Sequence, residues 1–309
     1  MKTRINFKTI MFPLTVFILI SSFSVAFGIG IKIKVNENIV TEKWGSEKTH
    51  VKVPGGIVFL DDFIYATDKE EGTIVVLDRE GNFQNQSSAD DLFLIEPTII
   101  KTDGKLLYVI DSGINQLKIV TKNFELLKSI NLPVLFPGFN YWDLEIIDKK
   151  IYLSSNLLLE EYAAIYELDE NGTVHKISKG FIGYLSNFSG ELMAANSLEY
   201  FKGENENGLE EEGGKSGKNS LFKVTDYELK LEFEYLSKYM PLDFLLVNDF
   251  IYVFSGAYKN LDKYTTDGQY VETLLQLVYT DIFIQLALCD NSILVAVPFK
   301  KAIYKVNIN

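Results

Sequence analysis

The chain carries a strong hairpin signal at Thr98-Ile99-Ile100-Lys101-Thr102, Asp103-Gly104, Lys105-Leu106-Leu107-Tyr108-Val109-Ile110-Asp111. Two β-rich runs flank an Asp-Gly turn, the strongest short-range signal for two antiparallel strands. The same unit precedes this one at residues 56–68 and follows it at residues 144–155. A hairpin that recurs along the chain indicates a repeat protein.

The repeat has a nearly constant period. Anchored on its second strand, it recurs with spacings of 43, 44, 41, 59 and 42 residues at Tyr65, Tyr108, Tyr152, Met193, Tyr252 and Leu294. The long spacing contains the polar run 202–218, and deleting these 17 residues brings it to 42. Periods of 40 to 50 residues with several strands per unit are typical of propeller blades. Six units therefore predict six blades.

Each unit is predicted to hold four strands, because a third β-rich run and a second turn with Gly or Asn follow the hairpin. The chain after the N-terminal segment shows no sustained helical period. The predicted fold is all-β, a six-bladed β-propeller of four-stranded antiparallel blades. The last unit has only three strands, and residues 39–44 align with a fourth. We therefore expect an N-terminal strand that completes the last blade and leaves no long sheet edge unpaired.

The N-terminus has the features of an export signal. Lys2, Arg4 and Lys8 precede an uncharged run over residues 9–31, which ends in small residues that suit cleavage. Residues 1–28 are predicted to be a signal peptide or an N-terminal membrane anchor, because the run is also long enough to cross a bilayer. Both interpretations place the protein outside the cell or in its envelope. The propeller then covers residues 29–309, with a flexible acidic loop insertion at 202–218.

The charge and the cysteine content narrow the functional classes. The formal net charge is −12, and it becomes −15 without the three basic residues of the signal segment. A surface this acidic repels phosphate backbones, so no nucleic-acid partner is expected. Cys289 is the only cysteine and lies in an apolar run. We expect it to be a small buried side chain rather than a reactive thiol, and the core must hold the fold without a disulfide.

Four segments of the first unit resemble an NHL-type repeat of the NHL-type and TolB-like six-bladed β-propellers, namely Trp44-Gly45-Ser46, Val53-Pro54-Gly55-Gly56-Ile57, Phe63-Ile64-Tyr65-Ala66-Thr67-Asp68 and Ile74-Val75-Val76-Leu77-Asp78. Only the first two units match the motif well. Later units replace the Asp at the end of the second strand by Ser155, Asn196, Ser255 and Val297. The resemblance implies a fold and leaves the function open. Some propellers that are similar overall are metal-dependent lactonases with Glu, Asn and Asp ligands around the channel, where Asp143 and Glu145 would contribute here.

The predicted blade geometry gathers the long loops on one face. The loops between the second and third strands lie on the same side as the loops that join consecutive blades, and we call this side the long-loop face. Aromatic rings combine apolar area with a polar group, which suits a sugar or a peptide. The candidate ligand-binding residues on this face are Phe139, Tyr141, Trp142, Asp143 and Tyr258. The alternative is that residues 136–142 cap the core between two blades.

A cation site at the mouth of the channel is a second candidate. Asp68, Asp111 and Asn196 follow the second strands of three units and offer the oxygen ligands that Ca²⁺ prefers. Ca²⁺ is the only cofactor that the sequence suggests. The alternative is that these short side chains accept hydrogen bonds from the backbone N–H groups of their own loops.

Catalysis has little support in the sequence. His50 and His175 are the only histidines, neither is placed for general base chemistry, and no Ser or Cys lies in a nucleophile motif. The preferred hypothesis is an exported binding or scaffold protein that recognises an extracytoplasmic protein, peptide or glycan on its long-loop face. The alternative is a Ca²⁺-dependent lactonase-like hydrolase. Membrane contact is expected only through an uncleaved N-terminal segment.

Overall fold

The computed structural model describes residues 39, 41–133, 141–155, 163–169, 171–204, 210–215, 219–225, 228–235, 239–279 and 283–308, without the side chains of 89, 199–204 and 210–215. The predicted signal or anchor segment, residues 1–28, lies outside this set, as does Phe139. None of the helices in the described part of the chain is long and apolar enough to cross a bilayer.

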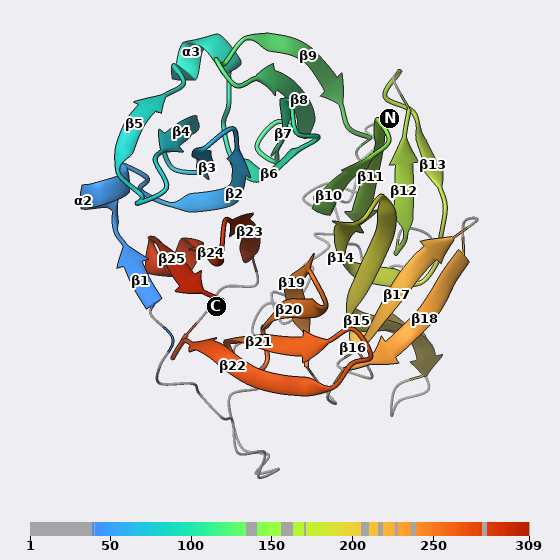
Figure 1. Cartoon of the computed structure of the whole chain (residues 1–309). Coiled ribbons are helices and arrows are strands. Elements are labelled where there is room, and N and C mark those ends of the chain that lie inside the picture. The colour runs from blue at the N-terminus through green and yellow to red at the C-terminus, as the bar shows by residue number, and fades with distance from the viewer. Residues whose placement is uncertain are drawn as a thin grey trace, which may run out of the picture. The chain divides into compact units, whose positions relative to one another are not determined.

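The described residues form six antiparallel sheets that follow one another around a ring, as predicted (Figure 1). The first three blades are β2 (Pro54–Leu60), β3 (Phe63–Asp68), β4 (Thr73–Leu77) and β5 (Phe83–Gln86); β6 (Pro97–Thr102), β7 (Leu106–Asp111), β8 (Gln116–Thr121) and β9 (Leu126–Asn131); and β10 (Tyr141–Ile147), β11 (Lys150–Ser155), β12 (Ile165–Leu168) and β13 (Val174–Lys176).

The last three blades complete the ring. They are β14 (Phe181–Phe188), β15 (Glu191–Glu204), β17 (Ser220–Thr225) and β18 (Glu228–Glu234); β19 (Pro241–Val247), β20 (Phe250–Ser255), β21 (Asn260–Thr265) and β22 (Tyr270–Gln276); and β23 (Gln285–Cys289), β24 (Ser292–Val297), β25 (Ala302–Asn307) and β1 (Thr41–Trp44). Three single turns of helix lie in the loops: α2 (Ser46–Thr49), α3 (Ala89–Leu92) and the 3₁₀ helix η1 (Pro298–Lys300).

The first strand of each blade lies nearest the axis of the ring and contacts the first strands of the neighbouring blades (Figure 1). In the Asp103-Gly104 turn only Gly104 has a positive φ, +87°, and the next strand begins at Leu106. Other hairpin turns have two such residues. Asp61 and Asp62 have φ values of 48° and 69°, and Asp148 and Lys149 have 49° and 67°. Two consecutive residues with positive φ define the two-residue turn whose twist matches that of the flanking strands. These short turns lie on one face of the ring, and the longer loops lie on the other.

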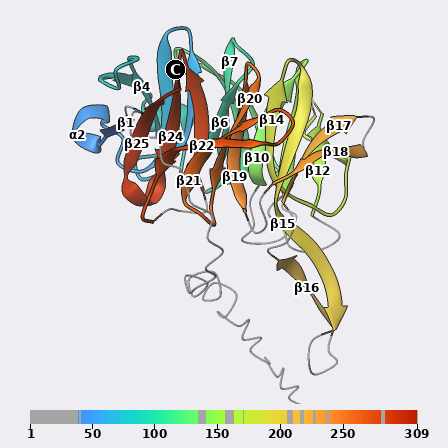
Figure 2. The same cartoon turned by 60° about the horizontal axis from the view of Figure 1, so that its bottom comes forward.

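The polar insertion contains ordered strand segments. The sequence predicts a flexible loop at 202–218, whereas the structure places residues 202–204 at the end of β15 and residues 210–215 in β16 (Glu210–Lys215). The two strands pair antiparallel from Glu199 opposite Lys215 to Glu204 opposite Glu210. Figure 2 shows this hairpin extending beyond the ring. It continues the second strand of blade four into the long-loop face.

The N-terminal strand closes the ring as predicted. β1 pairs antiparallel with β25, from Thr41 opposite Val306 to Trp44 opposite Ile303, and thereby supplies the fourth strand of blade six. Trp44 is 1% exposed and packs in the same apolar cluster as Cys289. The prediction of a buried cysteine is confirmed, since Cys289 is 1% exposed, and burial raises the pKa of its thiol to about 11.

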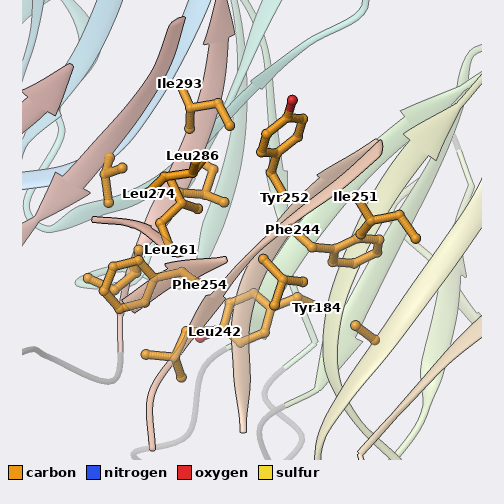
Figure 3. Packing of buried hydrophobic residues seen from close by; sticks show 14 of the residues in the cluster. Tyr184, Leu242, Phe244, Ile251, Tyr252, Phe254, Leu261, Leu274, Leu286 and Ile293 are labelled. Carbon is orange, nitrogen blue, oxygen red and sulfur yellow. The ribbon is translucent and has the colours of Figure 1, made fainter. Parts of the chain in front are cut away.

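The core consists of apolar wedges between adjacent sheets. The largest cluster joins blades four, five and six, where Phe244, Phe254 and Leu261 are completely buried (Figure 3). Burying one such side chain stabilises the fold by roughly 2–3 kcal/mol. The core thus fixes the loops at the two faces of the ring without a disulfide.

Candidate functional site

Asp68 lies at the end of β3 and connects two loops of the long-loop face. Its carboxylate is fully buried and accepts hydrogen bonds from the backbone N–H groups of Lys52 at 2.6 Å, Glu70 at 2.9 Å and Glu71 at 3.3 Å. These groups belong to the loop before β2 and to the loop between β3 and β4. The predicted loop-capping role of this side chain is therefore confirmed.

Asp111 and Asn196 bind their own loops in the same way. Asp111 accepts the backbone N–H groups of Ile95, Glu96 and Gly113 at 2.9–3.1 Å, and Asn196 accepts that of Ser220 at 2.5 Å. The three candidate ligands thus serve three different blades. Across the described residues, no three acidic, His or Cys side chains are grouped so that they could hold a metal ion. Ca²⁺ needs six to eight oxygen ligands, and this arrangement does not fit it.

The aromatic residues at the start of β10 point into the protein. Tyr141 is 4% exposed, packs in a core cluster, and donates from its hydroxyl to the carbonyl of Pro133 at 3.2 Å. Trp142 is half-buried and stacks on Tyr184, with ring centroids 5.7 Å apart. These contacts support the alternative that the segment caps the core between two blades. Neither ring extends freely from the long-loop face.

Tyr258 lies at a hollow on the long-loop face of blade five. The hollow has a volume of about 480 Å³ and is lined by Ala257, Tyr258, Lys259, Gln276, Leu277 and Val278. The loop between β20 and β21 forms one wall, and the end of β22 forms the other. Lys259 connects the two walls, because its carbonyl accepts the backbone N–H of Leu277 at 2.8 Å. Such a volume falls in the range that accommodates a side chain or a small ligand.

Exposed aromatic side chains continue from this hollow along the face. We call the set Tyr258, Tyr279, Phe283 and Phe299 the aromatic arc; Tyr258 is half-buried, and the other three are 60%, 37% and 65% exposed. Lysine ammonium groups lie over its rings: Lys259 and Lys300 are 5.6 and 5.4 Å from the centroid of Tyr279. Lys69 of blade one is 5.5 Å from that of Phe283. The arc therefore runs from blade five past blade six to blade one.

A second cluster of functional groups lies near the axis of the ring. We call Lys101, Asp143, Glu145 and Asp243 the axial cluster, and all four come from innermost strands. The ammonium of Lys101 is 3.5 Å from Oδ1 of Asp143 and 4.0 Å from Oε2 of Glu145. Asp143 is completely buried and Asp243 is 1% exposed. One cation thus faces three buried carboxylates.

The two aspartates of this cluster connect neighbouring blades. Asp143 accepts the backbone N–H of Leu185 at 2.9 Å, and Asp243 accepts that of Leu286 at 2.7 Å. Each acceptor belongs to one blade and each donor to the first strand of the next blade. A buried carboxylate that accepts an N–H is a strong hydrogen-bond partner. Both aspartates therefore have a structural role besides any chemical one.

Burial dominates the electrostatics of the axial cluster. It raises the pKa of Glu145 and that of Asp243 to about 7, although Lys101 favours the charged forms of both. Burial likewise raises the pKa of Asp143. For Lys101, burial opposes the charge, but the three carboxylates together raise its pKa above the ordinary value. Carboxyl groups that titrate near neutrality can exchange protons with a bound ligand.

Neither Lys101 nor Asp243 is predicted from the sequence as a site residue. The signal that could have found them is a charged residue inside an apolar first strand at the same position in different units. Lys101 pairs with Tyr108, and Glu145 pairs with the equivalent Tyr152. The lysines beside the arc gave no comparable signal, because they lie in loops.

The comparisons with known proteins show the fold. No protein-family model and no curated protein matches the chain. A streptogramin B lyase structure is 17% identical with a TM-score of 0.57, and the match covers 88% of this chain and 98% of that one. Virginiamycin B lyase from Staphylococcus aureus is 12% identical with a TM-score of 0.56, covering 88% and 100% of the two chains. A putative gluconolactonase is 12% identical with a TM-score of 0.55, covering 89% and 93%.

These identities are too low to transfer an activity, since unrelated functions share one fold. The proteins that resemble this chain carry out different chemistry, and what they share with it is the ring of six four-stranded sheets. The chain is a six-bladed β-propeller of the kind that these lyases and the gluconolactonase adopt.

Proposed function

We propose that this chain is an exported propeller of the NHL type that binds or scaffolds other molecules and recognises a protein, peptide or glycan on its long-loop face. The observation that carries the proposal is the distribution of exposed apolar side chains. Seven large ones among the described residues lie in loops of this face: Phe93, Ile95, Ile114, Val278, Tyr279, Phe283 and Phe299.

Exposed apolar surface on this scale favours a binding role. Val278, Tyr279 and Phe299 are 74%, 60% and 65% exposed. Single apolar residues on a surface need no explanation, whereas a contiguous patch is typical of interaction sites. Lys300 approaches the rings of both Tyr279 and Phe299, at 5.4 and 5.8 Å, so these exposed side chains of blades five and six lie close together. Loops held by a rigid scaffold are also where binding residues usually lie.

A photo-crosslinking experiment tests the proposal. The full chain is produced in its native host with benzoylphenylalanine in place of Tyr279 or Phe299, irradiated, and purified. We expect both positions to crosslink to the same partner. The matched control replaces Leu231, which is 52% exposed on the outermost strand of blade four. Equal crosslinking from the control position, or none from the arc, would refute the proposal.

Export forms part of the proposal and has its own test. The basic residues and the uncharged run at residues 9–31 support it. N-terminal sequencing of the protein purified from the envelope or medium would distinguish a cleaved signal from a retained anchor. We expect a mature chain that begins shortly after residue 28. A protein that remains inside the cell with its N-terminus intact would contradict export.

A lactonase-like hydrolase is the second candidate function, and the axial cluster favours it. Glu145 and Asp243, with pKa values of about 7, suit general acid or base chemistry. The predicted calcium ligands do not fit a shared ion, so a hydrolase would have to use the axial cluster instead. Lactone hydrolysis by the purified chain, lost in Glu145→Gln while the fold is kept, would support this function. Metal analysis of the same preparation shows whether a divalent ion takes part.

A further inference from the structure

Two lysines on the long-loop face have no acidic partner within the described residues. Neither Lys259 nor Lys300 lies within 4.0 Å of a carboxylate there, whereas Lys52, Lys69 and Lys301 of the same face pair with Glu71, Glu96 and Glu70. The chain as a whole is acidic, with a formal net charge of −12. A protein that is so acidic has many carboxylates with which to neutralise its lysines, yet within the described residues these two lysines have none within 4.0 Å.

The two lysines lie where a ligand would meet them. Lys259 lines the hollow of blade five, and Lys300 is beside it, because both ammonium groups approach the ring of Tyr279. Both side chains are half-buried, and the attraction of a cation to an exposed ring is only about 0.5–1 kcal/mol, so it leaves the ammonium groups able to pair with an anion. The ammonium groups thus form a positively charged rim at the mouth of the hollow.

The backbone of Lys259 indicates that its position is constrained. Its φ is +61°, a left-handed conformation that lysine seldom adopts. Two hydrogen bonds hold it there, one from its own N–H to the carbonyl of Ser255 and one from the N–H of Leu277 to its carbonyl, both 2.8 Å long. Such unusual conformations persist where the surrounding structure enforces them, frequently at binding sites. The backbone that carries the Lys259 side chain is therefore held on both sides by hydrogen bonds.

The walls of the hollow distinguish between kinds of ligand. Ala257, Leu277 and Val278 present aliphatic surface, and Val278 is 74% exposed. A sugar ring would need several polar groups around its hydroxyls, and only the hydroxyl of Tyr258, the amide of Gln276 and the ammonium of Lys259 are at hand. An aliphatic side chain fits the part of the wall that Ala257, Leu277 and Val278 form. The positive rim would then bind acidic residues on either side of that side chain.

We propose that the hollow of blade five binds an acidic peptide segment, with one apolar side chain against Val278 and flanking carboxylates paired with Lys259 and Lys300. This proposal rests on the proposed function and names the ligand of that face. Recognition of this kind combines an apolar anchor, which supplies affinity, with charges, which supply specificity and a fast association rate.

Fluorescence anisotropy with the full chain and labelled peptides tests the proposal. The probe is a capped peptide with one leucine between two pairs of glutamates, and its controls replace the glutamates by glutamines or the leucine by glycine. We expect Lys259→Glu and Lys300→Glu each to weaken binding of the probe at least tenfold, and added salt to weaken wild-type binding. The glutamine peptide should bind poorly to every variant.

Lys149→Glu is the matched control. Lys149 also has a left-handed φ, +67°, but it lies in the turn between β10 and β11 on the opposite face. The same charge reversal there should change the affinity less than twofold. Equal losses at Lys149 and Lys259 would show a general charge effect and would overturn the proposal. Binding that neither Lys259→Glu nor Lys300→Glu changes would also overturn it.

A double-mutant cycle tests the apolar contact. Val278→Ser should weaken binding of the leucine peptide but have little effect on the glycine peptide, since the two changes remove the same contact. Additive losses would contradict the proposed place of the side chain. Lysine-dependent binding of an oligogalacturonate, without binding of the peptides, would replace the peptide by an acidic glycan. In that case, or if no peptide binds, crosslinking from Tyr279 would still support binding on this face. The proposed binding function and the proposed peptide ligand can therefore fail separately.

Discussion

Tyr239 donates a hydrogen bond from its phenol to the buried carboxylate of Asp262, with Oη and Oδ2 2.5 Å apart. Asp262 lies in β21 and also accepts hydrogen bonds from Thr273 and Asn260. The ring of Tyr239 is 5.9 Å from that of Tyr258, centroid to centroid. The buried carboxylate therefore holds the ring that supports one wall of the hollow in blade five.

Replacing Tyr239 by Phe should destabilise the protein. The change removes a donor from a carboxylate that is 1% exposed, and a hydrogen bond to a charged group contributes about 1.5–3 kcal/mol. Urea unfolding followed by circular dichroism measures the loss. The matched control is Tyr252→Phe, a buried tyrosine of the same blade whose hydroxyl makes no hydrogen bond with the described residues. Equal losses in both variants would show that the bond to Asp262 contributes nothing specific.

The free energy of unfolding should fall as the pH rises from about 4 to 7. Burial raises the pKa of Glu145 and Asp243 to about 7, whereas such groups titrate near 4 in an unfolded chain. In this window the folded chain binds more protons than the unfolded chain, so deprotonation favours unfolding. This loss of unfolding free energy is absent below pH 4 and complete above pH 7. For Glu145 alone it amounts to roughly 3 kcal/mol.

Urea midpoints at pH 5 and pH 8 check this prediction. Glu145→Gln should show a smaller decrease between the two values than the wild type, because glutamine has no proton to lose. Glu125→Gln is the control, since this glutamate is exposed in the loop between β8 and β9. If the wild type is equally stable at both values, or if Glu125→Gln flattens the profile as much, the buried carboxyl groups are not the cause.

Lys101→Met should destabilise the protein more at pH 8 than at pH 5. At the higher pH the variant leaves buried carboxylates without their cation, which costs about 3–5 kcal/mol for a buried pair. At the lower pH Glu145 and Asp243, with pKa values of about 7, are protonated and need no counter-charge. Lys122→Met is the control, because the pair of Lys122 with Asp61, 2.7 Å long, lies on the surface with both side chains about half exposed. We expect its midpoint to stay close to that of the wild type, and a loss at Lys101 that does not depend on pH would contradict the argument.

The ring was predictable from the sequence because each repeat carries residues that mark its own hairpin turn. Pairs such as Asp61-Asp62 and Asp148-Lys149 mark the hairpins, and the structure gives all four residues a positive φ. The closing strand was predictable for the same reason, since residues 39–44 align with the fourth strands of complete units. Thr41 opposite Val306 confirms that alignment. Local turn chemistry repeated six times leaves few alternative folds.

The candidate sites were less predictable because they depend on register and on contacts between loops. The first strands contain bulges between Pro97 and Ile99 and between Tyr141 and Asp143, and these decide which side chains meet near the axis. A one-residue change of register moves a side chain to the other side of its sheet. The hollow joins segments 19 residues apart, so Tyr258 was predicted there but its partner Val278 was not. Sequence patterns identify strands, whereas sites also need the pairing between them.

Gly81→Ala should destabilise the closure of the ring, where blade one contacts Trp44 of the closing strand β1. A Cβ at Gly81 would lie 2.4 Å from the ring of Trp44, and the φ of +83° adds backbone strain. Left-handed alanine costs about 1–2 kcal/mol and overpacking a further 1–3, so we expect roughly 3 kcal/mol in urea unfolding. Gly104→Ala separates the two effects, because Gly104 has a φ of +87° with no atom within 4 Å of its Cβ. If both variants lose the same free energy, Trp44 can move aside, and the closing strand does not depend on this contact.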